Sequence, residues 1–277
     1  MFRTIMVHAD GLDGTTVRTR LAATLARRFD ASLIGVAATA LRLPLELYDA
    51  ALGTVALGPD YTEIDRTEVE AEFSRNKTAF DKATGKDGIE TQWRAIFADP
   101  GAVITAAAAA ADLIVLGSGD HTLLGNLNAP SAGDIVLHIG RPILVVPAKY
   151  AGTDVGSSIV VAWKNTPESQ RAISDALPFM KRATTVTVLS VSDKDGADAT
   201  LADAEAFLVR HGIAARTATR LRENLSVEDM ILEFAAQQKA DLIVAGAYGH
   251  TRLREWVFGG VTRTLLDRAP VPFLLSH

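Results

Sequence analysis

The sequence predicts an α/β protein made of two copies of one unit, each a parallel sheet with helices on both faces. Two observations lead to this prediction. Short continuous apolar segments alternate with amphipathic ones, which is typical of parallel strands that are buried on both sides. The same series of segments then occurs twice within 277 residues, and a unit repeated at this length indicates tandem domains.

Three apolar strands mark the repeat. Each strand of the first copy has a similar segment in the second copy: 4–10 corresponds to 158–164, 111–117 (ADLIVLG) to 240–246 (ADLIVAG), and 142–147 to 271–275. The first copy therefore ends near Pro147, and the stretch 148–157, rich in Gly, Ser and Thr, is typical of a linker. We expect domains over residues 1–150 and 156–277.

Helices are expected after the strands. Asn165, Thr166 and Pro167 supply N-cap oxygens and a proline suited to a first helical turn. The apolar face that follows is formed by Ala172, Ile173, Ala176, Leu177 and Met180. Asp99-Pro100-Gly101 opens a helix of the first copy in the same way, and the alanine run 106–111 is expected to continue it close against the sheet.

The two copies differ in the middle. The other expected elements are strands at 32–36 and 89–95, a turn at 193–198 and a helix at 201–210. Residues 41–85 are a long extra segment of the first copy. Its apolar part, 41–60, is expected to be a surface excursion, a flap or an interface element.

Composition excludes several classes of protein. The chain has 28 Lys and Arg against 33 Asp and Glu, a formal charge of −5, and no cysteine. Without cysteine it holds no disulfide, thiolate zinc site, iron–sulfur cluster or cysteine nucleophile. Nucleic acid is not expected as a partner, because sequence-independent phosphate contacts need clustered Lys and Arg.

A membrane span is not expected either. The longest weakly polar run, 102–116, is rich in alanine and contains Thr105 and Asp112, and it falls short of the roughly 20 apolar residues that cross a bilayer. Asp10 and Asp13 interrupt the N-terminus too early for a signal peptide. These features favour a cytoplasmic protein.

Glycines cluster where open parallel sheets place their ligands, beyond the carboxyl ends of the strands. Gly246-Ala247-Tyr248-Gly249 follows a strand, nine residues intervene, and Gly259-Gly260-Val261-Thr262 opens the last helix. Glycine lets main-chain N–H groups approach an anion, and a helix N-terminus adds roughly half a positive charge. The pattern therefore predicts a phosphate cradle, with His250, Arg252, Arg254 and Arg263 nearby. A purely structural turn stays open as the alternative.

This spacing, Gly-x2-Gly-x9-Gly, is neither the dinucleotide fingerprint nor a Walker loop. It resembles the nucleotide-binding signature of the universal stress protein family. Residues 5–11 and 159–165 resemble the first strand and turn of that family, and 240–275 resembles its C-terminal end. The resemblance implies two tandem Rossmann-like (adenine-nucleotide alpha hydrolase-like) domains, each a five-stranded parallel sheet with helices on both faces. It also implies that the domains pair through their last strands.

The resemblance further implies that ATP, ADP or AMP binds in the second domain, between the first-strand turn and the glycine motif. The implied binding residues are Ala162, Trp163, Lys164, Val191, Gly246, Gly249, His250, Arg252, Gly259, Gly260, Val261 and Thr262. Val191, after the second strand, would contact the adenine through its backbone. Two positions depart from the family: Gly260 replaces a small hydroxyl residue, and Lys164 replaces an aspartate that would reach the ribose. Lys164 would then meet a phosphate or a carboxylate, or be solvated.

The first copy departs in the complementary way. It keeps Asp10-Gly11, but it has Asp120 in place of the second glycine and Pro130-Ser131 in place of the third glycine and its neighbour. An aspartate repels a phosphate, and a proline removes one N–H donor. We therefore expect weak or absent nucleotide binding there, and at most one good site per chain.

Three hypotheses for function remain. The first is a stress-response regulatory protein that binds an adenine nucleotide with little turnover. The second is slow ATP hydrolysis or phosphoryl transfer with Mg²⁺, in which His250 would assist. The third is a scaffold that binds a non-nucleotide ligand, favoured if Lys164 and Gly260 spoil nucleotide affinity. No Gly-x-Ser-x-Gly elbow and no metal-binding histidine spacing occurs, so no catalytic residue is assigned. Whether two chains form a homodimer stays open.

Overall fold

The architecture is described for most of the chain. The described residues of this computed structural model are 1–12, 14–40, 59–85, 88–118, 130–192, 198–222, 225–248 and 260–277, and the side chains of 59–65 are not among them. The expected turn at 193–198, apart from its last residue, and the apolar segment 41–58 lie outside this part.

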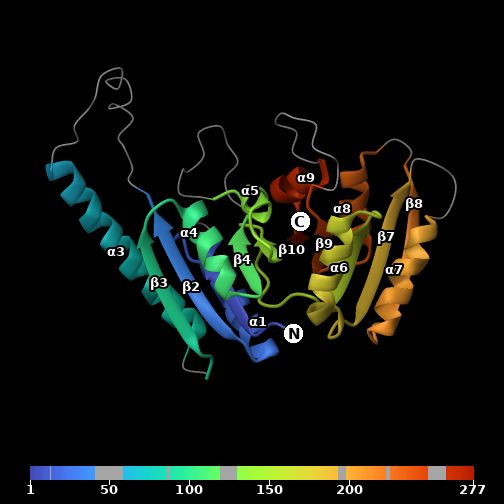
Figure 1. The fold of residues 1–277 in the computed structure, drawn as a ribbon, viewed down its shortest axis with the longest axis horizontal. Coiled ribbons are helices and arrows are strands. Elements are labelled where there is room, and N and C mark those ends of the chain that lie inside the picture. Colours follow the sequence, from blue (N-terminus) through green and yellow to red (C-terminus); the bar gives the residue numbers. More distant parts are fainter. Residues whose placement is uncertain are drawn as a thin grey trace, which may run out of the picture.

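The described strands form a single sheet. Those of the first half are β1 (Thr4–His8), β2 (Ser32–Thr39), β3 (Thr91–Phe97), β4 (Leu113–Gly117) and β5 (Ile143–Val146). Those of the second half are β6 (Ser158–Trp163), β7 (Thr185–Ser192), β8 (Ala215–Leu221), β9 (Leu242–Gly246) and β10 (Phe273–Ser276). Their order is β3-β2-β1-β4-β5-β10-β9-β6-β7-β8 (Figure 1). All pairings within each half are parallel, which confirms the expected fold class.

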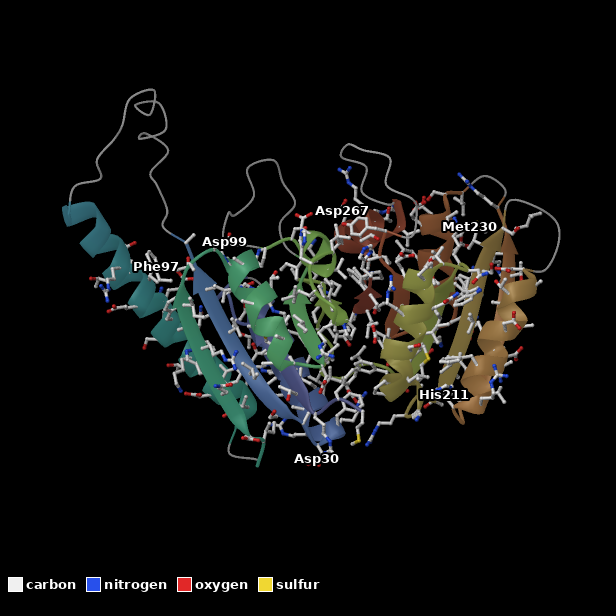
Figure 2. The ribbon with its side chains drawn as sticks, in the orientation of Figure 1. Asp30, Phe97, Asp99, His211, Met230 and Asp267 are labelled. Carbon is white, nitrogen blue, oxygen red and sulfur yellow. The ribbon has the colours of Figure 1, made fainter. Side chains whose placement is uncertain are left out.

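The two halves meet at their last strands. β5 and β10 pair antiparallel, and the opposed residues are Ile143 and Leu275, Leu144 and Leu274, and Val145 and Phe273. This pairing makes the sheet mixed and leaves β3 and β8 as its two edges. Figure 2 shows Phe97, the last residue of β3, and Asp99, which follows it, on the upper side. Asp30 and His211, which precede β2 and β8, lie on the lower side.

Helices cover both faces of the sheet. The first half has α1 (Thr15–Phe29), α3 (Pro59–Thr84), α4 (Pro100–Ala107) and α5 (Ala132–Val136). The second half has α6 (Pro167–Met180), α7 (Ala199–Arg210), α8 (Val227–Gln237) and α9 (Gly260–Arg268). In the described part of the chain, no helix has the length and apolar character needed to span a bilayer.

Several boundaries differ from the sequence prediction. β2 continues three residues beyond the expected end, to Thr39, and β3 occupies 91–97 instead of 89–95. The alanine run is not helical to its end, because α4 gives way to a 3₁₀ turn at Ala108–Ala110 that leads into β4. Most of the long extra segment is the 26-residue helix α3, which the sequence analysis did not predict.

The aspartate of the repeated Ala-Asp-Leu-Ile-Val segment has a structural role in both halves. Asp112 Oδ2 accepts hydrogen bonds from the main-chain N–H groups of Arg3 (2.7 Å) and Thr4 (3.0 Å), at the start of β1. Asp241 accepts from the three consecutive N–H groups of residues 156–158, at the start of β6, at 2.9–3.0 Å. Each aspartate thus ties the fourth strand of its half to the first.

Two buried clusters fill the space between sheet and helices, and both run through the two halves. In the first, Phe2, Phe29 and Phe179 stack edge to face, with ring centroids 5.1–5.5 Å apart, which joins α1 to α6. The second lies on the other face, under α4, α5, α8 and α9. α5 lies beside α9 there (Figure 1). The halves therefore share their core.

Candidate functional site

The strand order reverses direction at one point in each half, between β1 and β4 and between β6 and β9. Open α/β sheets bind ligands at such a switch point, outside the carboxyl ends of the strands. In the second half, Ala162 at the end of β6 lies opposite Ala245 of β9, and Gly246 follows directly. The structure therefore brings the first-strand turn and the start of the glycine motif together, as the sequence analysis expected.

The implied binding residues of the described part divide between the two faces of the sheet. Ala162, Val191 and Val261 are partly buried against the cluster under α8 and α9. Trp163 belongs to the other face, where its Nε1 donates to Thr200 Oγ1 of α7 at 3.1 Å. Its indole is thus held away from the α8–α9 face. Val191 lies within β7, paired with Arg220 of β8, and not after the strand as expected.

Gly246 is required by the packing of α6. A Cβ at this position would lie 2.6 Å from the main-chain N of Ser169 and 2.7 Å from the carbonyl carbon of Glu168. The first turn of α6, which begins after the N-cap Thr166, therefore rests directly on the end of β9. This contact explains Gly246 without a ligand, and it also brings a helix N-terminus to the switch point.

The start of α9 faces a carboxylate. A Cβ at Gly260 would overlap Glu228 Oε1 and lie 3.0 Å from its Cδ. Glu228 is in the first turn of α8, and its neighbour Asp229 fixes the two helices by an ion pair with Arg268 of α9, at 2.8 Å. The glycine that replaces the family's hydroxyl residue thus makes room for a negative charge. Sequence analysis missed Glu228, because it is 32 residues away in the chain.

Other expected site residues are placed less favourably or lie outside the described part. Thr262 is only 2% exposed, so its hydroxyl does not face solvent. Lys164 is exposed, and its main-chain oxygen accepts from Thr166 N at 2.7 Å in the turn before α6. Gly249, His250, Arg252 and Gly259 are outside the described residues, as are Arg254 and Asp120. Within the described residues, no three His, Cys, Asp or Glu side chains are grouped closely enough to hold a metal ion.

The equivalent place in the first half is filled by an internal ion pair. Asp10 Oδ1 accepts from Arg18 (2.7 Å), from the main-chain N–H of Leu12 (3.1 Å) and from Thr15 Oγ1. Burial alone would raise the pKa of Asp10, but Arg18, His8 and the hydrogen bonds lower this pKa to about 2. The Arg18 guanidinium is buried and also donates to the main-chain oxygen of His8 at 2.9 Å. The carboxylate that would meet a ribose is therefore already neutralised.

His8 completes this cluster. It is 1% exposed, its Nδ1 lies 3.4 Å from Asp10 Oδ2, and its Nε2 has no hydrogen-bond partner among the described residues. Burial lowers the pKa of His8 to about 4, and Arg18 adds to this effect while Asp10 opposes it. His8 is therefore neutral near pH 7. The second half has Ala162 at the matching position.

We predict that His8 makes the protein less stable as the pH falls from about 6.5 to 4. In this range the unfolded chain binds a proton at the histidine and the folded chain does not, so the free energy of unfolding decreases, by ~3 kcal/mol in total. Urea unfolding of the full chain at several pH values should show a much smaller decrease in His8→Leu. The exposed His138→Gln is the control, and an equal decrease in all three proteins would contradict the prediction.

We also predict that Gly246→Ala destabilises the protein. The added methyl group must push the first turn of α6 away from the end of β9, and overpacking of this kind costs about 1–3 kcal/mol. Gly140→Ala is the matched control, because a Cβ at Gly140 meets no atom within 4 Å. Thermal and urea unfolding measure the difference. Equal stability of the two variants would show that α6 tolerates a side chain at Gly246.

Comparison with known proteins gives a consistent result for the whole chain. The model of the universal stress protein family matches residues 1–147 and again residues 157–277. A universal stress protein of Synechocystis is 27% identical over 173 residues, a match that covers 59% of this chain and 57% of the relative. The chain thus spans little more than half the length of that relative.

Two solved structures share the fold over almost the full length. The crystal structure of a universal stress protein from Archaeoglobus fulgidus has a TM-score of 0.73 at 15% identity, and covers 99% of this chain and 95% of its own. A structure from Pseudomonas aeruginosa has a TM-score of 0.58 at 18% identity, and covers 99% and 93%. At these identities the likeness concerns the fold alone.

Proposed function

This chain belongs to the universal stress protein family, with two such domains in tandem, and we propose that it is a regulatory protein that binds one adenine nucleotide in its second domain. One observation carries the proposal. The ends of β6 and β9 lie side by side at a topological switch point, and the equivalent place in the first domain is occupied by the Asp10–Arg18 pair. The two domains therefore differ in what their switch points leave for a ligand.

Features of the second domain match the phosphates and the adenine of a nucleotide. The N-terminus of α9 and the main-chain N–H groups around Gly260 would face the phosphates. The apolar side chains of Ala162 and Val191 lie on the same face of the sheet and would lie beside the adenine. Lys164 is exposed at the end of β6, where a cation would favour an anionic ligand. His250 and Arg252 stay candidates on sequence grounds.

We predict that calorimetry with the purified full chain shows one adenine nucleotide bound per chain. Gly249→Asp combined with Gly259→Pro places the residues of the first domain in the second, and should abolish binding because it adds a negative charge and removes an N–H donor. As the matched control, Asp120→Gly with Pro130→Gly should leave one site per chain, because Arg18 still neutralises Asp10. Absence of binding at millimolar ATP, ADP and AMP would reject the proposal.

Glu228 bears on the choice between nucleotide binding and hydrolysis. Without a metal, its carboxylate lies beside the N-terminus of α9 and repels a phosphate there. With Mg²⁺, a carboxylate next to a phosphate is a usual ligand of the ion. This arrangement favours Mg²⁺-assisted slow ATP hydrolysis as the second candidate function. Single-turnover assays with labelled ATP test it, and Lys164→Ala and His250→Ala should slow the reaction if it occurs.

We predict that Glu228→Gln strengthens ATP binding in the presence of EDTA, by about threefold to tenfold, because it removes a negative charge that competes with the phosphates. The matched control is Glu233→Gln, which makes the same change at an exposed position of α8. Calorimetry in EDTA and in Mg²⁺ compares the variants. If Glu228→Gln bound ATP more weakly in both conditions, Glu228 would contact the ligand favourably. This result would contradict the prediction that its carboxylate competes with the phosphates.

A further inference from the structure

The glycine turn of the second domain makes a contact with the first domain. Tyr248 lies in this turn and packs against the buried cluster that contains α5 and α9. Its hydroxyl lies at Gly133 on α5, where an added Cβ would be 2.6 Å from Tyr248 Oη and 3.1 Å from Leu266 Cδ1. There is no room for a side chain at Gly133 while Tyr248 keeps this position.

The sequence makes this contact one-sided. When the two glycine segments are aligned, Tyr248 corresponds to Gly119, and Gly133 corresponds to Thr262. A large residue of the second domain therefore faces a glycine of the first, and the reciprocal positions hold two small residues. At these aligned positions, the long side chain belongs to the second domain.

The backbone of the turn needs such a support. Tyr248 has a φ of 58°, in the left-handed region that non-glycine residues rarely adopt. Residues in sparsely populated regions persist when their surroundings hold them there, and they cluster at ligand sites. Tyr248 directly precedes Gly249, the second glycine of the motif, so the angle at Tyr248 sets the direction in which the chain leaves β9.

We propose that the first domain positions the nucleotide-binding turn of the second, and that the contact between Gly133 and Tyr248 transmits this effect. Tyr248 and Gly133 are then positioning residues for the ligand. The inference rests on the proposed function for its ligand, but the effect on the turn itself is independent of any ligand. It gives the first domain a role that does not require a nucleotide of its own.

The test is a set of variants of the full chain. Gly133→Ala places a methyl group against the Tyr248 hydroxyl and should weaken ADP binding about tenfold or more. Tyr248→Phe removes the hydroxyl and keeps the ring, and the double variant Gly133→Ala with Tyr248→Phe should bind ADP within about threefold of Tyr248→Phe alone. Gly140→Ala is the control without a neighbour within 4 Å, and should not change binding.

Hydrogen exchange supplies a measurement that needs no nucleotide. The amide of Ala247 is bonded to Ser276 O at 2.8 Å, so Gly133→Ala should speed exchange in the peptide that contains 242–248, and the double variant should restore it. Failure of the unmodified chain to bind ATP, ADP and AMP, with this exchange effect present, would reject the proposed function and keep the positioning role. Two results would overturn the inference. One is unchanged hydrogen exchange in Gly133→Ala, and the other is a double variant whose exchange and ADP affinity are no closer to those of the unmodified chain than in Gly133→Ala.

Discussion

The antiparallel pairing of β5 with β10 is the contact on which the rest of the structure depends. Left alone, each half would end its sheet in a strand with unpaired main-chain groups, which is an edge that proteins must cover. Here each half covers the other. The pairing also sets the angle at which the halves meet, and so it places α5 beside α9 on one face and the Phe29 and Phe179 rings together on the other.

The two switch points of the sheet differ in their charged residues. In the first domain a buried arginine neutralises Asp10, and the neighbouring His8 is kept uncharged, so that the charges of the site are balanced by the protein itself. In the second domain the matching positions are Lys164, which is exposed, and Ala162. The Glu228 carboxylate lies beside the start of α9. A site whose charges are already paired within the protein gains little from a ligand.

The fold was predictable because strands buried on both sides leave continuous apolar segments in the sequence, and these occurred twice. Helix α3 could not be predicted in this way, because few of its described side chains are buried. They are the apolar Val69 and Phe80 and the polar Asn76 and Thr84. The glycine spacing predicted where the candidate site lies, but it did not predict which residues contact these glycines. Gly246 against α6, Gly260 against Glu228 and Gly133 against Tyr248 all join segments that are distant in the chain, and no local pattern reports such pairs.

The pair of Tyr248 and Gly133 also bears on why two domains are joined in one chain. An interface between identical subunits related by a two-fold axis is built from the same residues twice, so each residue must suit both of its places. A tyrosine at position 248 would then demand a glycine opposite it on both sides. Covalent duplication removes that demand, since each copy mutates separately. The fused chain can keep one half as a binding module and let the other specialise as its scaffold.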